Sequence, residues 1–275
     1  MSVNILILST LFFQFLGVTT HPSRQRISAG VGDPNGYAAL LDVLIPLAIY
    51  RALNVSGIRR VLYLAIIIAL TVLLMLTGSR GGYLGFVAAA CVLLYHYGTR
   101  RILAVTVLTV CIAGTVYFAA PDLFWQRADS ITVSQKRDSS IDLRLGHYRA
   151  ALLMFLDHPL TGVGIGNFRL NNLKYGDVRS QVVHDTYLEV LTGGGLLSLI
   201  PFLMIELTCW RSLSIKECNE KALSDLLICL KASFASLLTT GLFLSAAYDK
   251  TLWFSFSLIS SAYYAIPSKM ELCTF

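Results

Sequence analysis

The sequence predicts an all-helical membrane protein: a bundle of about eight transmembrane helices with one long connection that contains an amphipathic helix. Hydrophobic residues make up 55% of the 275 positions and charged residues only 14%, whereas soluble domains average roughly 45–50% apolar and about 25% charged residues. The apolar residues also form continuous runs rather than alternating with polar ones. Continuous runs favour membrane helices over a β-barrel.

A helix that spans the bilayer needs about 20 mostly apolar residues. About eight stretches of the sequence meet or nearly meet this requirement. In chain order they are 3–20, 36–51, 61–78, 82–97, 102–120, 185–210, 226–247 and 252–267. The first follows no basic segment and precedes no soluble domain, so we expect a retained span rather than a signal peptide. The chain then divides into five spans in residues 1–120, a loop at 121–183, and three spans in 184–275.

The basic residues of the short connections predict the orientation, because Lys and Arg concentrate on the cytoplasmic side. With the N-terminus inside, the larger group lies on the inner side: Arg51, Arg59, Arg60, Arg100, Arg101, Arg211, Lys216, Lys221 and Lys269. The smaller group lies outside: Arg24, Arg26, Arg80 and Lys250. We therefore expect a multi-pass membrane protein with both termini on the cytoplasmic side. The net charge of +6 fits contact with the lipid bilayer, and the sequence contains no basic domain typical of nucleic-acid binding.

The connection at 121–183 is much longer than ordinary loops, which rarely exceed about 12–15 residues without structure of their own. Apolar residues at helical spacing run through "IDLRLGHYRAALLMFLDHPL": Ile141, Leu145, Tyr148, Leu152, Phe155 and Leu156. This pattern predicts an amphipathic helix that ends before Pro159, holds its apolar stripe against the membrane or neighbouring helices, and directs Arg144 elsewhere. The following "TGVGIGNF" supplies glycines for a tight reversal. At the second span, Asp33 and Asn35 are expected to be cap and turn residues.

Three polar residues are candidates for a functional site because the predicted orientation places all of them on the outer face of the membrane. Arg80 lies in a glycine turn at the edge of hydrocarbon, where a cation is either functional or an interfacial anchor. Arg144 either lines a cavity or belongs to the solvated face of a surface helix. His184 heads a span next to Asp185, and an acid at a helix start also complements the helix dipole. The residues alone leave these alternatives open.

Four strings in order carry a resemblance to a known family: "GDPNGYAALL", "LTGSRGGYLG", "DLRLGHYRAALLMFLDHPLTGVGIGNF" and "HDTYLEVLTGGGLLSLIPFL". Together they resemble the superfamily of O-antigen ligases and O-antigen polymerases, which are bacterial membrane glycosyltransferases. The sequence departs from the usual pattern at Asp185, where the family has asparagine, and in "LTGGGLLS", which replaces a form closer to E-x-G-L-x-G. Members usually have about twelve spans, so the resemblance implies that four N-terminal helices are missing here.

The resemblance implies transfer of a glycan from a polyprenyl-pyrophosphate carrier to a hydroxyl of a lipid, glycan or protein acceptor. Arg80 and Arg144 would bind the pyrophosphate, because the guanidinium fork matches phosphate oxygens. His184 would be the catalytic base that accepts the proton of the acceptor hydroxyl. No cofactor and no metal are expected. The outer segments have no D-x-D pair, and the other histidines lack the spacing of metal ligands: His21, His96, His147 and His158.

Other functions remain open at this point. The same residues suit an O-antigen polymerase, which joins repeat units instead of transferring a finished glycan. Charged residues at membrane depth also mark the substrate paths of transporters. A truncated, inactive relative would keep the same strings without activity.

The predicted orientation is testable by labelling single cysteine substitutions in intact cells with a membrane-impermeant reagent. Cysteines at Ser139 and Ser180 should react, because both positions lie in the predicted outer loop, and one at Ser214 should not. Labelling at position 214 alone would reverse the predicted topology.

Overall fold

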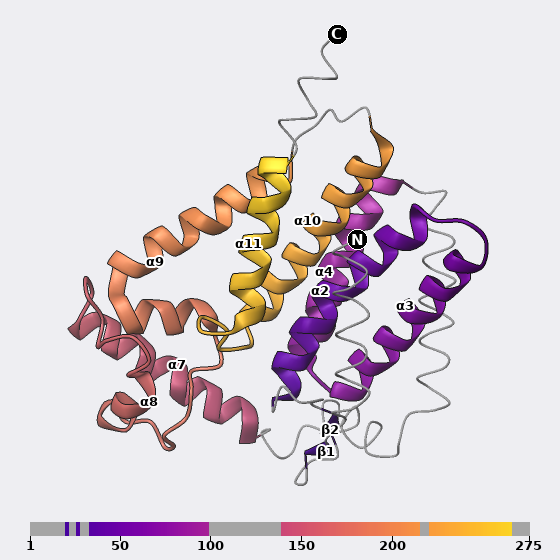
Figure 1. Cartoon of the computed structure of the whole chain (residues 1–275). Coiled ribbons are helices and arrows are strands. Elements are labelled where there is room, and N and C mark those ends of the chain that lie inside the picture. Colours follow the sequence, from indigo (N-terminus) through magenta and orange to yellow (C-terminus); the bar gives the residue numbers. More distant parts are fainter. Residues whose placement is uncertain (1–19, 22–25, 28–32, 99–138, 215–219, 266–275) are drawn as a thin grey trace. The chain divides into compact units, whose positions relative to one another are not determined.

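The computed structural model describes residues 20–21, 26–27, 33–98, 139–214 and 220–265 of the chain (Figure 1). Its helices are α2 (Pro34–Leu53), α3 (Gly57–Thr77), α4 (Arg80–Tyr97), α7 (Ser139–Asp157), α8 (Phe168–Asn171), the 3₁₀ helix η1 (Asn172–Tyr175), α9 (Thr186–Ser212), α10 (Lys221–Gly241) and α11 (Lys250–Ala265). Two two-residue strands, β1 (Thr20–His21) and β2 (Arg26–Ile27), pair antiparallel. Apart from this short pair, the described residues confirm the predicted all-helical class.

The predicted spans between residues 36 and 97, and those after 184, each coincide with a helix, whereas the predicted spans 3–20 and 102–120 lie outside the described residues. Four helices, α2, α3, α9 and α10, are long and apolar enough to cross a membrane. Helix α10 ends at Gly241, six residues before the predicted boundary of 247. It ends there because residues 242–249 form a connection that hydrogen-bonds to the start of α9.

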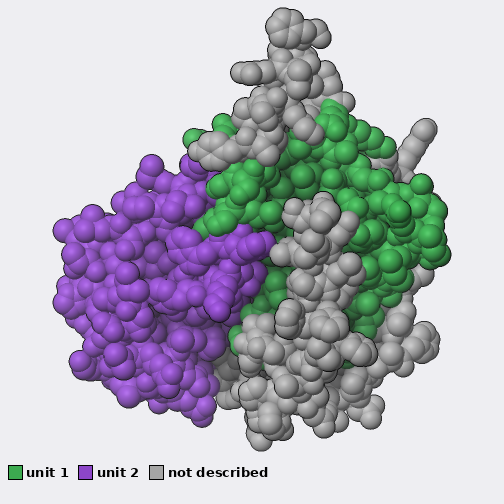
Figure 2. Space-filling model, in the orientation of Figure 1, with its two compact units in different colours: residues 1–120, 210–240, 255–275 green, residues 121–209, 241–254 purple. Residues whose placement is uncertain are grey.

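The chain forms two compact units, which Figure 2 colours separately. Unit 1 consists of residues 1–120, 210–240 and 255–275, and unit 2 consists of residues 121–209 and 241–254. The division falls within α9, α10 and α11. The three-part division expected from the spans and the outer loop stays a prediction about membrane topology.

Unit 1 is built around α2, whose side chains are largely buried. Asp33 caps the helix by accepting hydrogen bonds from the backbone N–H groups of Asn35 and Gly36, which confirms its predicted role. Within the unit, the Thr240 hydroxyl donates to the buried Asp42 carboxylate at 2.9 Å. A Cβ at Gly85 would lie 2.6 Å from that carboxylate. The glycine therefore lets α4 approach α2 and α10 closely, as small residues do between membrane helices.

Unit 2 contains a helix that is broken in the middle. Gly195 of α9 has φ 62° and ψ −156°, a backbone conformation that essentially only glycine adopts, and α9 turns sharply on itself there (Figure 1). A break of this kind interrupts the regular hydrogen bonds from each N–H to the carbonyl four residues earlier. At membrane depth the freed groups need partners within the protein.

Residues 159–164, which we call the strap, supply those partners. The N–H groups of Val163 and Gly164 donate to the carbonyls of Thr192 and Gly193 at 2.8 and 3.0 Å. The N–H groups of Leu196 and Leu197 donate to the strap carbonyls of Pro159 and Leu160 at 2.9 and 3.2 Å. These four groups of α9 are those that would bond to each other in an unbroken helix. The strap therefore replaces two lost helical hydrogen bonds with four hydrogen bonds of its own.

We predict that Gly195→Ala destabilises the protein strongly. The new Cβ would lie 2.3 Å from the Leu160 carbonyl and would force an unfavourable backbone conformation as well, so we expect a loss of about 3 kcal/mol or more. The thermal unfolding midpoint in detergent measures this.

Gly176→Ala is the matched control. Gly176 also has a positive φ, 79°, but nothing lies within 4 Å of the position of a Cβ. The control should lose only the cost of the backbone conformation, about 1–2 kcal/mol. Equal losses in the two variants would show that the strap does not press on the break.

Candidate functional site

His184 lies directly before the first residue of α9 in an unusual backbone conformation. Its φ is 61°, the only positive value of a non-glycine residue among the described parts of the chain. Its N–H donates to the hydroxyl of Ser245 at 3.0 Å. Asp185 then caps the helix, because its carboxylate accepts the N–H of Leu188 at 2.8 Å. The turn at His184 thus places an imidazole at the N-terminal end of α9.

The connection 242–249 holds the start of α9 through hydrogen bonds on consecutive residues. The Thr186 hydroxyl donates to the Leu244 carbonyl at 2.6 Å and accepts the N–H of Ala246 at 3.0 Å. One turn later the buried Glu189 carboxylate accepts the N–H of Ala247 at 3.2 Å. Side chains of α9 thus satisfy the backbone groups of a short loop between two helices. This connection therefore holds His184 and the first turn of α9 in place.

Helix α7 packs beside the same region through a different stripe from the one the sequence predicted. Its buried residues are His147, Ala150, Ala151 and Met154, at the i, i+3, i+4, i+7 spacing of one helix face. Ala151 and Met154 form an apolar cluster with Phe168 and Val183. The leucines expected to hold the helix, Leu145, Leu152 and Leu156, are 56%, 51% and 69% exposed. These leucines lie away from the buried face of α7, and their contact with a membrane stays a prediction.

Arg144 lies half-buried on α7 and belongs to the same electrostatic environment as the start of α9. The pKa of Tyr148, which lies one turn further along α7, reflects both charges. Burial raises the pKa of its phenol, the negative charge of Asp185 raises it further, and the positive charge of Arg144 lowers it. Arg144 lies one turn before Tyr148, which packs against the apolar cluster that includes Val183, the residue before His184.

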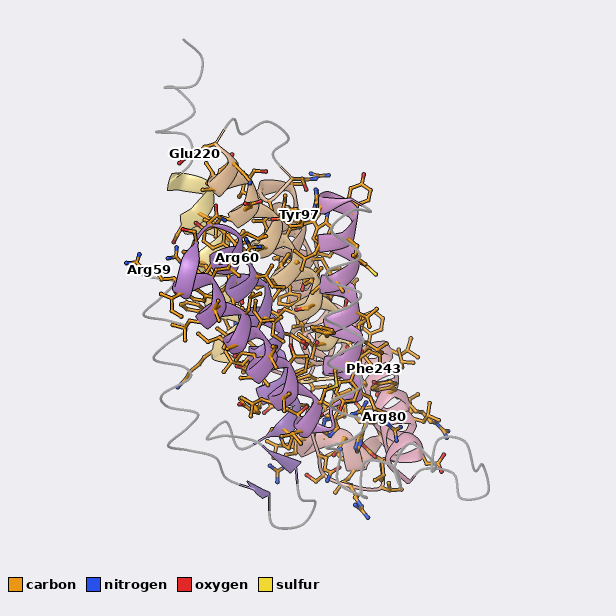
Figure 3. All side chains as sticks on the ribbon, turned by 90° about the vertical axis from the view of Figure 1, so that its right-hand side faces the viewer. Arg59, Arg60, Arg80, Tyr97, Glu220 and Phe243 are labelled. Carbon is orange, nitrogen blue, oxygen red and sulfur yellow. The ribbon has the colours of Figure 1, made fainter. Side chains whose placement is uncertain are left out.

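Arg80 belongs to unit 1. The turn before it is made by Gly78, which has φ 60°, and Ser79, whose hydroxyl accepts the N–H of Gly82 at 3.2 Å. Arg80 is therefore the first residue of α4, and its side chain is exposed. Figure 3 shows it at the end of unit 1 opposite to Arg59 and Arg60, as expected if the two ends face opposite sides of a membrane. The convergence of Arg80 with His184 and Arg144 stays a prediction.

Sequence reasoning missed a polar network next to His184. His147 is buried, and its Nδ1 atom lies 2.5 Å from the Asp177 carboxylate. The Asn172 amide donates to the same carboxylate at 2.8 Å. No motif in the sequence links His147 to Asp177, which lies 30 residues further along the chain.

Among the described residues, no three His, Cys, Asp or Glu side chains lie where they could hold a metal ion. The polar cluster of unit 2 consists instead of one arginine, two imidazoles and several hydrogen-bonded carboxylates. Such a set can bind an anionic group and move a proton. The chain also has apolar helices long enough to cross a membrane. Together, these helices and the polar cluster define a polytopic membrane protein with a polar site at the N-terminal end of the broken helix α9.

Comparison with known families agrees with this class. A family model described as O-antigen ligase matches residues 64–203, about half of the chain. The chain belongs to the O-antigen ligase family. The matched range includes Arg80, Arg144 and His184, as well as the strap and the break in α9. No curated protein matches the chain significantly.

We predict that Asp185→Asn, which restores the residue expected for the family, stabilises the protein at neutral pH. Burial raises the pKa of the Asp185 carboxyl above its ordinary value, although hydrogen bonds from the Leu188 and Tyr187 backbone lower it. Because the folded state holds the proton more tightly than the unfolded state, Asp185 costs stability as the pH rises from the ordinary value through the raised one. Asparagine keeps an oxygen for the cap without that charge.

Thermal unfolding at acidic and neutral pH checks this prediction. The advantage of Asp185→Asn over the wild type should grow toward neutral pH. Asp185→Ala is the control, because it removes the cap and should cost about 0.5–2 kcal/mol. A stability of Asp185→Asn below that of wild type at neutral pH would contradict the reasoning.

Proposed function

We propose that the chain is a glycosyltransferase that moves a glycan from a polyprenyl-pyrophosphate carrier to an acceptor hydroxyl at the outer face of the cytoplasmic membrane. His184 is the catalytic base, and Arg80 and Arg144 bind the pyrophosphate. The observation that carries this proposal is the match to the O-antigen ligase family over a range that contains all three residues. The proximity of Arg144 to residues beside His184 supports it.

The chemistry of the transfer suits these side chains. Breaking the bond between sugar and phosphate leaves negative charge on the pyrophosphate, and charge-assisted hydrogen bonds from arginine stabilise that charge as it forms. The acceptor hydroxyl loses its proton as its oxygen attacks the sugar. Histidine suits this step because its ordinary pKa lies near neutral pH. The half-buried position of Arg144 limits screening by water and strengthens its interaction with phosphate.

The acceptor distinguishes a ligase from a polymerase. A ligase transfers the glycan to a different molecule, such as a lipid, whereas a polymerase adds it to another carrier-linked glycan. We favour the ligase because the matching family carries that description. Incubating the purified chain with labelled donor and each acceptor in turn separates the two activities. Uptake of donor without transfer would instead support a transporter, and neither activity would indicate an inactive relative.

We predict that His184→Ala lowers the transfer rate by about 10²–10⁴-fold while donor binding stays close to that of wild type. A base acts mainly in the transition state, so its loss affects kcat more than binding. The measurement uses the purified chain in lipid nanodiscs with a polyprenyl-pyrophosphate glycan. Wild-type transfer by His184→Ala would remove the histidine from the mechanism.

We also predict that Arg144→Lys weakens both donor binding and transfer, because an ammonium group cannot reproduce the two parallel hydrogen bonds of a guanidinium. Arg149→Lys is the matched control. Arg149 lies on the same helix but is exposed, and this substitution should leave both quantities unchanged. Equal effects of the two substitutions would show that α7 contributes only its overall charge.

A further inference from the structure

The Nδ1 side of the buried His147 ring faces a network of hydrogen bonds centred on Asp177. Asp177 accepts the Nδ1 proton of His147 and the Asn172 amide on one carboxylate oxygen, and the N–H of Val178 on the other at 2.7 Å. Asn172 also donates to the carbonyl of Arg179 at 2.7 Å. Several donors therefore hold the carboxylate in place. They assign the proton of neutral His147 to Nδ1, since a carboxylate accepts and does not donate.

The other ring nitrogen of His147 has no hydrogen-bond partner among the residues that the structure describes. Nε2 is buried, and no described group forms a hydrogen bond to it. With the proton on Nδ1, this nitrogen presents a lone pair. Native proteins rarely leave such a buried group unbonded, and an exception calls for an explanation such as a role in function or a bound water.

The ring of His184 lies next to the ring of His147. The centroids of the two imidazoles are 6.1 Å apart and the rings are tilted by 43°. Two imidazole rings at this separation are close enough for one water to bridge a nitrogen of each. The hydrogen bond from the His184 N–H to Ser245 helps to hold the backbone of His184 in its unusual conformation.

We propose that Asp177 and His147 form a relay behind His184, in which Nε2 of His147 accepts the N–H of His184, directly or through one water. The proposal rests on the proposed transferase function. In the transfer, the acceptor O–H bond breaks and its proton goes to the ring nitrogen of His184 that faces the acceptor. The acceptor oxygen bonds to the sugar, and the sugar–phosphate bond breaks with its electron pair leaving on the pyrophosphate.

In this arrangement His147 is a positioning residue. It fixes which nitrogen of His184 carries the proton at rest, so that the other nitrogen presents the lone pair of the base. When His184 becomes an imidazolium, its second N–H donates toward His147, and the Asp177 charge behind His147 stabilises the new positive charge. The dyad thus increases the basicity of His184.

Other titratable groups also belong to this cluster and act on its charge. They are Arg144 and Tyr148 on α7, Asp185 and Glu189 at the start of α9, and Tyr248 in the connection. The test therefore leaves these groups in place and changes only the relay.

The central variant is His147→Asn. The asparagine amide occupies the position of Nδ1 and still donates to Asp177, but nothing replaces Nε2. We expect thermal unfolding and donor KM close to those of wild type, with kcat reduced about tenfold or more. A purely structural histidine predicts an unchanged kcat in this variant, and that result would overturn the relay.

A second readout does not depend on transfer. Nuclear magnetic resonance of the chain in nanodiscs, with ¹⁵N-labelled histidine, follows the titration of His184. Its midpoint should move to lower pH in both His147→Asn and Asp177→Asn, because the stabilising negative charge is disconnected or removed. An unchanged midpoint in a folded variant would overturn the relay. Absence of transfer by the wild-type chain would instead overturn the proposed function.

Discussion

The structure of unit 2 depends on an exchange of backbone hydrogen bonds between the strap and the break in α9. Two helical bonds, from Leu196 to Thr192 and from Leu197 to Gly193, are absent, and the strap provides a partner for each of the four groups. In an apolar environment each unpaired group would cost several kcal/mol. The break is therefore stable only with residues 159–164 in place, and the strap is fixed in turn by the break.

This exchange joins two segments of the chain that are separate in the sequence. "DHPLTGVG" contains the strap, and "LTGGGLL" contains the break that the strap fills. A Cβ at Gly162 would lie 2.4 Å from the carbonyl of Thr192, so both strings need glycine at their contact. The short first part of α9 then carries His184 at its start, where the connection 242–249 and the network of His147 reach it. Arg144 lies on the same helix as His147 and Tyr148, which contact His184 and the cluster around Val183.

The sequence predicted the features that depend on local patterns. The described helices follow the apolar runs, Asp33 caps α2 as expected, and "TGVGIGNF" forms the tight reversal, with positive φ at Gly162, Gly164 and Gly166. Features that depend on contacts distant in sequence were not predictable. These include the pairing of the strap with α9, the early end of α10, and the bond between His147 and Asp177. The stripe that buries α7 was also misjudged, because small residues such as Ala150 and Ala151 form the packed face while larger leucines stay exposed.

Hydrogen exchange of the backbone amides tests most directly whether the strap holds the break in α9. In nanodiscs, the amides of Val163, Gly164, Leu196 and Leu197 should exchange slowly and together, since all four donate across the break. Gly162→Ala should release these four amides and speed exchange in residues 184–192, while amides near Asp33 in unit 1 stay unchanged. Slow exchange at the four amides that persists in Gly162→Ala, or fast exchange already in the wild type, would contradict the view that the strap holds the head of α9.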